Sequence, residues 1–285
     1  MRPDFDAHRD VWGPALAVQL RVWSESFFKP AEDLRRMGLF QPESLGDPPV
    51  AQPFAGGGPR ISPGEPGPHL LAEEPPGYER LRQFEASAAE YRFAVEPFSA
   101  PIFAQVLELI RLHLVADACL LDAACGPGTE AVALAAQVPD GEVVACDLSQ
   151  AMIREAAHYG AESGLHNIAF FQHDVEDLPG DWTGAFDAVL CMLSFHFLLD
   201  GAAAADSFFR VLAPGGKVFI ADPGPAWFNA MSASLSKLAN PAFVRYRTGE
   251  EFRDLLLAAG FHSPFWTEVL PGIGVAIATK PGSTP

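Results

Sequence analysis

The chain has 285 residues, 49% of them hydrophobic, and a formal net charge of −17. This length accommodates one large domain, or one domain with an appendage, and the apolar content suffices for a full core. Because 36 acidic residues stand against only 19 Lys and Arg residues, no basic face for nucleic acid is expected.

The cysteines and the apolar runs indicate where the protein resides. Cys119, Cys125, Cys146 and Cys191 form no CxxC pair. Free cysteines commonly behave as small buried hydrophobes, so neither a disulfide nor a metal site is predicted. No apolar run reaches the roughly 20 residues of a membrane span, and no apolar segment follows Met1 as in a secretory signal. We therefore expect a cytoplasmic protein.

The N-terminal 77 residues form a distinct predicted region. Apolar residues between positions 11 and 28 recur at three- and four-residue steps, which predicts a helix. Residues 41–77 contain ten prolines and three consecutive glycines, which exclude a helix or a central strand. We interpret residues 1–77 as an extension that packs on the main domain, joins two copies in a homodimer or caps a substrate pocket.

A helical cap segment is predicted over residues 78–115, interrupted near Pro97 and Pro101. From residue 116 to 285, strand and helix patterns alternate. The predicted strands are 119–123, 142–146, 168–172, 186–191, 217–221, 262–269 and 274–279. The predicted helices are 129–137, 149–163, 201–212 and 249–259. Such alternation specifies an α/β fold with a doubly wound, mostly parallel, seven-stranded Rossmann-like sheet. The short link at Pro271-Gly272 makes the last two strands an antiparallel hairpin.

The first of these strands leads into a glycine-rich turn. Residues 120–130 read LLDAACGPGTE, an apolar strand followed by a turn and the start of a helix. Gly126 and Gly128 carry no Cβ, so the backbone can turn sharply there and approach a ligand closely. Asp122 stands at the strand tip, and Asp147 ends the next strand, where a ribose diol needs an acceptor. These positions predict a ligand site at the carboxyl ends of the strands.

This pattern resembles the class I S-adenosylmethionine (SAM)-dependent methyltransferases over about residues 85 to 280. The resemblance rests on five segments in order: the glycine turn, the strand ending at Asp147, and residues 170–175, 186–192 and 211–217. It implies SAM as cofactor and S-adenosylhomocysteine (SAH) as product. The cofactor-binding residues that it implies are Asp122, Ala124, Cys125, Gly126, Gly128, Asp147, Leu148, Met152, Asp174, Val175, Cys191 and Tyr91.

Two other functions fit parts of the sequence. Residues 126–131 satisfy the G-x-G-x-x-G/A pattern of nicotinamide-dependent oxidoreductases. However, a dinucleotide would place its pyrophosphate beside the carboxylates of Asp122 and Glu130, whereas SAM places an ammonium group there. A non-enzymatic SAM-binding regulator is the other alternative, since the fold requires no catalytic residue.

Methyl transfer needs alignment of the acceptor and exclusion of water, and a base only where the acceptor must lose a proton. His196 follows the fourth strand and is the candidate base or pocket residue. That strand end lacks the Asn/Asp-Pro-Pro-aromatic motif of amine methylation on nucleic acids, and it lacks a metal-binding carboxylate. Aromatic residues gather at 225–231, Phe243, Tyr246 and Trp266. We therefore expect a small hydrophobic or aromatic acceptor, methylated at O, N or C.

Overall fold

A mixed eight-stranded sheet organises the protein, which we describe from a computed structural model. The structure describes residues 68–74, 78–82, 84–86, 88, 91, 96–225 and 242–282. The predicted helix at 11–28 and most of the proline-rich arm at 41–77 lie outside these residues. The strands are β1 (Pro68–His69), β2 (Cys119–Ala123), β3 (Glu142–Asp147), β4 (Ile168–Gln172), β5 (Phe186–Met192), β6 (Leu212–Pro223), β7 (His262–Leu270) and β8 (Ile273–Thr279).

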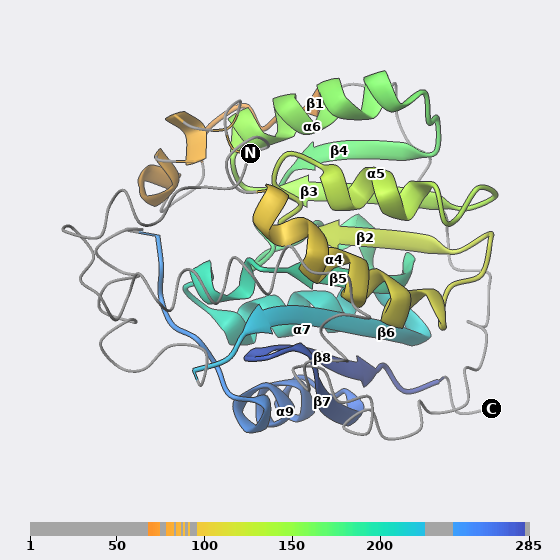
Figure 1. Ribbon diagram of the computed structural model, residues 1–285, viewed down its shortest axis with the longest axis vertical. Coiled ribbons are helices and arrows are strands. Elements are labelled where there is room, and N and C mark those ends of the chain that lie inside the picture. Colours follow the sequence, from red (N-terminus) through yellow and green to blue (C-terminus); the bar gives the residue numbers. More distant parts are fainter. Residues whose placement is uncertain are drawn as a thin grey trace.

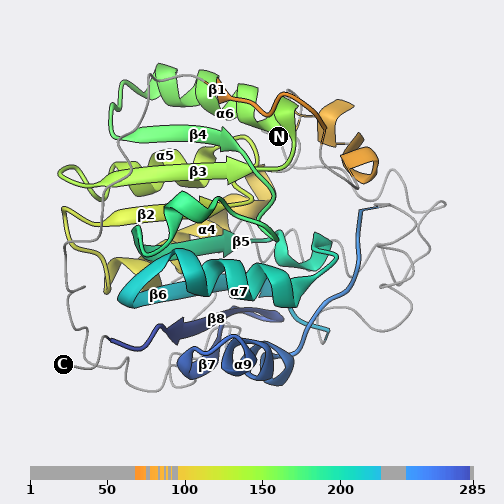
Figure 2. The ribbon, with the colours of Figure 1, turned by 180° about the vertical axis from the view of Figure 1, so that it is seen from behind.

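Helices cover both faces of this sheet (Figures 1 and 2). The α-helices are α4 (Glu96–Arg111), α5 (Thr129–Ala135), α6 (Gln150–Ser163), α7 (Gly201–Val211) and α9 (Gly249–Ala258), and short 3-10 helices are η3 (Tyr78–Leu81), η4 (Gly180–Trp182) and η5 (Phe195–Phe197). Successive side chains of a strand point to opposite faces. Leu120 accordingly packs in the core beneath α4, α5 and α6, and Leu121 in the core beneath α7 and α9. The predicted doubly wound fold is confirmed.

The strand order is β1-β4-β3-β2-β5-β6-β8-β7. The strands from β1 to β6 pair in parallel, whereas β8 pairs antiparallel with both β6 and β7. The chain thus winds from β2 outward through β3 and β4, and then returns to β5 on the other side of β2. Ligands of open α/β sheets bind at the carboxyl ends of the strands beside such a switch point.

The sheet has one strand more than the seven predicted. β1 pairs in parallel with β4 at the edge of the sheet, inside the segment predicted as an irregular arm. Pro68 lacks a backbone N–H, and an edge strand tolerates this because one of its sides has no neighbour to bond. The hairpin prediction at the other edge is confirmed, although β8, the later strand, lies between β6 and β7.

The predicted break at Pro101 is wrong, because α4 continues through this residue. A proline inside a helix costs about 3 kcal/mol. Ile102, Phe103, Val106 and Ile110 of α4 are all buried in the core. Each buried side chain of this size contributes roughly 1.5–3 kcal/mol, so packing outweighs the lost hydrogen bond. No helix among the described residues is long and apolar enough to cross a membrane.

Candidate functional site

The turn after β2 forms the floor of the site. Ala124, Gly126 and Gly128 all adopt left-handed backbone conformations, with φ of 60°, 53° and 85°. The turn is tied to the neighbouring strand because the Cys125 N–H donates to the Cys146 carbonyl at 2.9 Å. A Cβ added to Gly126 would meet nothing within 4 Å, whereas one added to Gly128 would lie 2.8 Å from the Ala156 Cβ. Gly126 therefore faces open space, and Gly128 serves close packing against α6.

The Asp147 carboxylate bridges the ends of β2 and β3. Its Oδ2 accepts a hydrogen bond from the Gly126 N–H at 2.9 Å, and its Oδ1 accepts one from the Ser149 N–H at 2.8 Å. Burial raises the pKa of Asp147 to about 6, although these two N–H groups act to lower it. The carboxylate is thus held rigidly at the strand ends, where it can accept further hydrogen bonds from a ligand.

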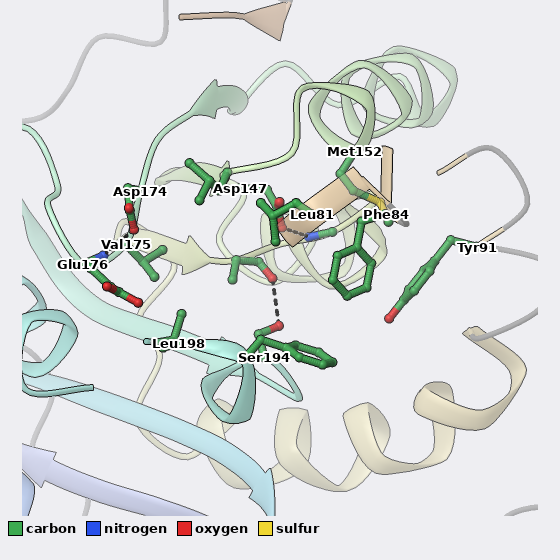
Figure 3. Close-up of a pocket in the computed structure, with 14 residues that line it drawn as sticks. Leu81, Phe84, Tyr91, Asp147, Met152, Asp174, Val175, Glu176, Ser194 and Leu198 are labelled. Atoms are coloured by element: carbon green, nitrogen blue, oxygen red, sulfur yellow. Dashed lines mark hydrogen bonds between the residues drawn. The ribbon is translucent and has the colours of Figure 1, made fainter. Parts of the chain in front are cut away.

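A pocket of about 700 Å³, counting its open mouth, lies over this floor (Figure 3). Its walls come from the strand ends, from α6 and from the cap segment. The lining residues are Leu81, Phe84, Tyr91, Ala124, Gly126, Asp147, Leu148, Met152, Asp174, Val175, Glu176, Ser194, Phe197 and Leu198. In Figure 3, Phe84 and Tyr91 lie on one side of the pocket, and Asp174 and Glu176 lie on the other. Apolar surfaces with a few converging polar groups are typical of small-molecule sites.

The structure brings eight of the predicted cofactor residues to this lining: Tyr91, Ala124, Gly126, Asp147, Leu148, Met152, Asp174 and Val175. Asp122, Cys125, Gly128, Cys191 and His196 lie outside it. Sequence reasoning missed Leu81, Phe84, Glu176, Ser194, Phe197 and Leu198, which also line the pocket. Four of these six, Glu176, Ser194, Phe197 and Leu198, lie in the loops that follow β4 and β5, and that position was the available signal. Leu81 and Phe84 carry no local signal of this kind.

Asp122 lies buried beside the pocket floor, with 2% of its surface exposed. Its Oδ2 has no hydrogen-bond partner among the described residues. Burial, and then the negative charges of Glu130 and Asp147, raise its pKa well above the ordinary value. An unpartnered buried carboxylate is costly unless a donor or a cation reaches it. The carboxylates around this turn therefore suit a cationic group and disfavour a phosphate.

His196 and Asp222 form a buried pair behind the pocket. The His196 Nδ1 lies 2.7 Å from the Asp222 Oδ1, and the aspartate is fully buried. Burial raises the pKa of Asp222, and the neighbouring imidazole acts in the opposite direction. The rings of Phe197, Phe243 and Tyr246 surround the imidazole, with centroids 4.0 to 5.9 Å away. An acceptor at Nδ1 fixes the ring and its tautomer, and directs Nε2 away from the aspartate.

Asp187 and Trp266 both contact residues of the protein core. Asp187 of β5 is buried and accepts a hydrogen bond from the Cys119 N–H at 2.8 Å. Trp266, a candidate substrate residue, stacks on Phe252 with ring centroids 5.5 Å apart. The aromatic segment at 225–231 lies outside the described residues after Pro225. Among the residues that the structure describes, no cluster of His, Cys, Asp and Glu is suited to hold a metal ion.

Known proteins with similar sequences indicate which kind of domain this chain carries. Residues 120–216 match a family model described as a methyltransferase domain. The ubiquinone biosynthesis O-methyltransferase of Xylella fastidiosa is 35% identical over 148 residues, which are 52% of this chain and 54% of that protein. The nocamycin O-methyltransferase of Saccharothrix syringae is 32% identical over 143 residues, half of each chain. The chain thus spans about half the length of these curated relatives.

Solved structures share the fold over a longer stretch. The DhpI complex with SAH has 26% identity and a TM-score of 0.56, covering 72% of this chain and 96% of that one. A SAM-dependent methyltransferase from Aquifex aeolicus, at 20% identity and a TM-score of 0.57, covers 68% of this chain and 98% of that chain, and shows the shared fold. The family model thus identifies a methyltransferase domain over residues 120–216, and the chain shares the fold of solved S-adenosylmethionine-dependent methyltransferases.

Proposed function

We propose that this protein transfers a methyl group from SAM to a hydroxyl oxygen of a small, hydrophobic or aromatic metabolite. The observation that carries the proposal is the pair of acidic residues at adjacent strand ends. Asp122 is buried with an unpartnered oxygen, and Asp147 lines the pocket and is held by two backbone N–H groups. The first suits an ammonium group and the second a ribose diol, and SAM carries both.

Other lining residues suit the remaining parts of this cofactor. Asp174 presents a carboxylate beside Val175, as expected for an acceptor of an adenine amino group, and Met152 offers an apolar surface to a ring. Leu81, Phe84 and Tyr91 cover the opposite side and limit access of water. When bound, SAM supplies a methyl group already activated by its sulfonium, so the protein mainly has to align the acceptor and exclude water.

His196 is the proposed general base, and Asp222 its positioning partner. A hydroxyl acceptor must lose its proton, and a base contributes typically 10²–10⁴-fold to rate where this is so. In this role Asp222 holds Nδ1, which lies 2.7 Å from its Oδ1, and Nε2 is the nitrogen that receives the proton. Ser194 and Phe197 flank His196 in the chain and line the pocket, so the pair lies next to the cofactor site. The names of the two O-methyltransferase relatives support oxygen as the methylated atom.

The first test is a calorimetric titration with SAM, SAH and NAD, on the wild type and on Asp147→Ala. Micromolar binding of SAM or SAH that the substitution abolishes is expected. Binding of NAD alone would support a dinucleotide-dependent oxidoreductase instead. A second experiment measures SAH formation with a panel of phenols, quinones and amines. Turnover of amines but not of phenols would contradict the proposed hydroxyl acceptor.

A non-enzymatic SAM-binding protein is the second candidate function. A solved structure named as the [4+2]-cyclase SpnF shares the fold, at 20% identity and a TM-score of 0.54, although its name gives a different reaction. The fold therefore does not compel methyl transfer. Cofactor binding without SAH formation, from any member of the panel or from cell extract, would favour this candidate.

We also propose that the protein acts in the cytoplasm. All four cysteines are free and buried, which suits the reducing cytoplasm. The expected homodimer through residues 1–77 and the expected absence of nucleic-acid partners are predictions, which the solution mass and a nucleic-acid binding assay test directly.

A further inference from the structure

The first turn of α6 is capped by side chains that come from the cap segment far upstream. Ser149 is the N-cap residue, and its Oγ accepts from the Met152 N–H at 3.1 Å. The Gln150 N–H donates to the Tyr78 hydroxyl at 3.0 Å. The Ala151 N–H donates to both carboxylate oxygens of Glu85, at 3.3 and 3.2 Å. Three N–H groups that the helix itself leaves unpaired are thereby satisfied.

Glu85 is the centre of this arrangement. Its Oε1 also accepts from the Tyr78 and Ser149 hydroxyls, each at 2.5 Å. A carboxylate at a helix N-terminus is further stabilised by the helix dipole. Burial, followed by the bond to Glu85, raises the pKa of Tyr78 to about 12, so its hydroxyl stays protonated and keeps donating. Glu85 thus binds the cap segment to α6 through charge-assisted hydrogen bonds, which are stronger than neutral ones.

The hydrogen bonds around Glu85 connect to the cofactor site in two places, at Asp147 and at the pocket wall formed by the cap segment. Ser149 receives the bond from Glu85 through its hydroxyl and gives its N–H to Asp147. The cap segment carries Leu81, Phe84 and Tyr91, which form one wall of the pocket (Figure 3). The Phe84 ring also contacts the Phe197 ring of η5, with centroids 5.4 Å apart and an edge-on geometry. Docking of the cap and organisation of the Asp147 loop therefore share one set of hydrogen bonds.

We propose that Glu85 is a positioning residue that latches the cap segment onto the first turn of α6, closes the pocket over the cofactor and slows its release. This inference rests on the proposed function for the identity of the cofactor, though not for the latch itself. If the latch opens, the closed state becomes less populated, and the apparent affinity falls by the same fraction.

The test compares Glu85→Ala and Glu85→Gln with the wild type, and with Glu73→Gln as control. Glu73 lies on the same side of the protein and is exposed, so its substitution makes the same charge change outside the latch. We expect Glu85→Ala to raise the dissociation rate of SAH about tenfold, the effect of losing one charged hydrogen-bond set, with a smaller rise for Glu85→Gln. SAH that leaves Glu85→Ala at the wild-type rate would overturn the proposal.

A double-mutant cycle with Ser149→Ala tests whether the two residues act as one unit. If they do, the double variant releases SAH no faster than the more affected single variant. Effects that multiply independently would show that Glu85 does not work through Ser149, against the proposal.

Hydrogen exchange of the ligand-free protein provides a readout without cofactor. Glu85→Ala should accelerate exchange in residues 78–82 and 84–86 and at the amides of Gln150 and Ala151, and Glu73→Gln should not. Unchanged exchange there would refute the latch. If the wild type binds neither SAM nor SAH, the proposed function fails, and the exchange comparison still decides whether the latch exists.

Discussion

The Asp147 Oδ2 lies 2.9 Å from the Gly126 amide nitrogen, and this hydrogen bond joins the carboxyl ends of β3 and β2. One carboxylate therefore holds the glycine turn and faces the pocket at the same time. Its environment is poor for a negative charge because it is buried, and Glu85 adds further repulsion. The two backbone donors do not fully offset these effects, so the pKa of Asp147 stays raised, at about 6.

We expect cofactor affinity to fall as the pH drops through about 6, the pKa of Asp147. Protonation removes the charge that strengthens bonds to a ribose diol. SAH affinity should decrease about tenfold between about pH 7.5 and pH 5, since one proton is involved. Asp147→Asn should bind more weakly at high pH and show a flat profile over this range. An equally steep profile in Asp147→Asn would assign the titration to another group.

The same pKa predicts the opposite sign for the stability of the ligand-free protein. The folded pKa of about 6 lies above the ordinary value of 3.8, so the folded state binds this proton more tightly than the unfolded chain. The charge of Asp147 thus opposes folding above about pH 6, and the opposition disappears as the pH falls toward 3.8. As the pH falls through this interval, the free energy of unfolding of the wild type should therefore rise relative to that of Asp147→Asn. Denaturant titration of both proteins at several pH values measures this difference.

Binding of SAM or SAH should release a proton from Asp122. Its pKa lies well above the ordinary value in the ligand-free protein, chiefly through burial. A nearby ammonium favours the ionised carboxylate and lowers this pKa. Calorimetric titration near pH 7 in buffers of different ionisation enthalpy measures the protons released. Asp122→Asn should release fewer protons than the wild type, and equal release would place the ammonium elsewhere.

Substitution of His196 or Asp222 should impair turnover without weakening cofactor binding. We expect His196→Ala to lower kcat about 10²–10⁴-fold, the usual contribution of a general base. Asp222→Asn keeps the shape but holds the other tautomer, so it should also lower kcat while the SAH affinity stays at the wild-type value. Single-turnover rates and SAH titrations measure the two quantities. Normal turnover in His196→Ala would leave this histidine a purely structural role.

Gly128→Ala and Gly126→Ala should separate packing from ligand binding. A Cβ at Gly128 would lie 2.8 Å from the Ala156 Cβ at a φ of 85°. Overpacking and the left-handed backbone together should lower the free energy of unfolding by about 2–4 kcal/mol. Gly126 has open space, so Gly126→Ala should lower the free energy of unfolding by only about 1 kcal/mol. It should weaken SAH binding more strongly than Gly128→Ala does, because Gly126 lines the pocket. Thermal unfolding and calorimetry of both variants measure these effects.

Local patterns in the sequence determined the core of the fold. The predicted strands at 119–123 and 168–172 coincide with β2 and β4, and the other core strands differ mainly at their ends. Apolar runs, glycine turns and helix periodicity act between near neighbours, so they are legible without tertiary contacts. The place of Asp147, Gly126 and Asp174 in the pocket lining was also predictable, because parallel strands bring their carboxyl ends to one edge of the sheet.

Tertiary structure alone decided which distant side chains meet. Glu85 and Ser149 are 64 residues apart, and His196 and Asp222 are 26 apart, yet each pair is in direct contact. Whether Asp122 or Asp147 reaches the pocket lining also depends on how the turn and the cap pack over the strand ends. No local pattern encodes these pairings, because they arise from the summed packing of the whole sheet and its helices. The sequence by itself thus specified the strands and the turn, and folding assembled the pocket wall, the buried His196–Asp222 pair and the contacts of Glu85 from separate segments.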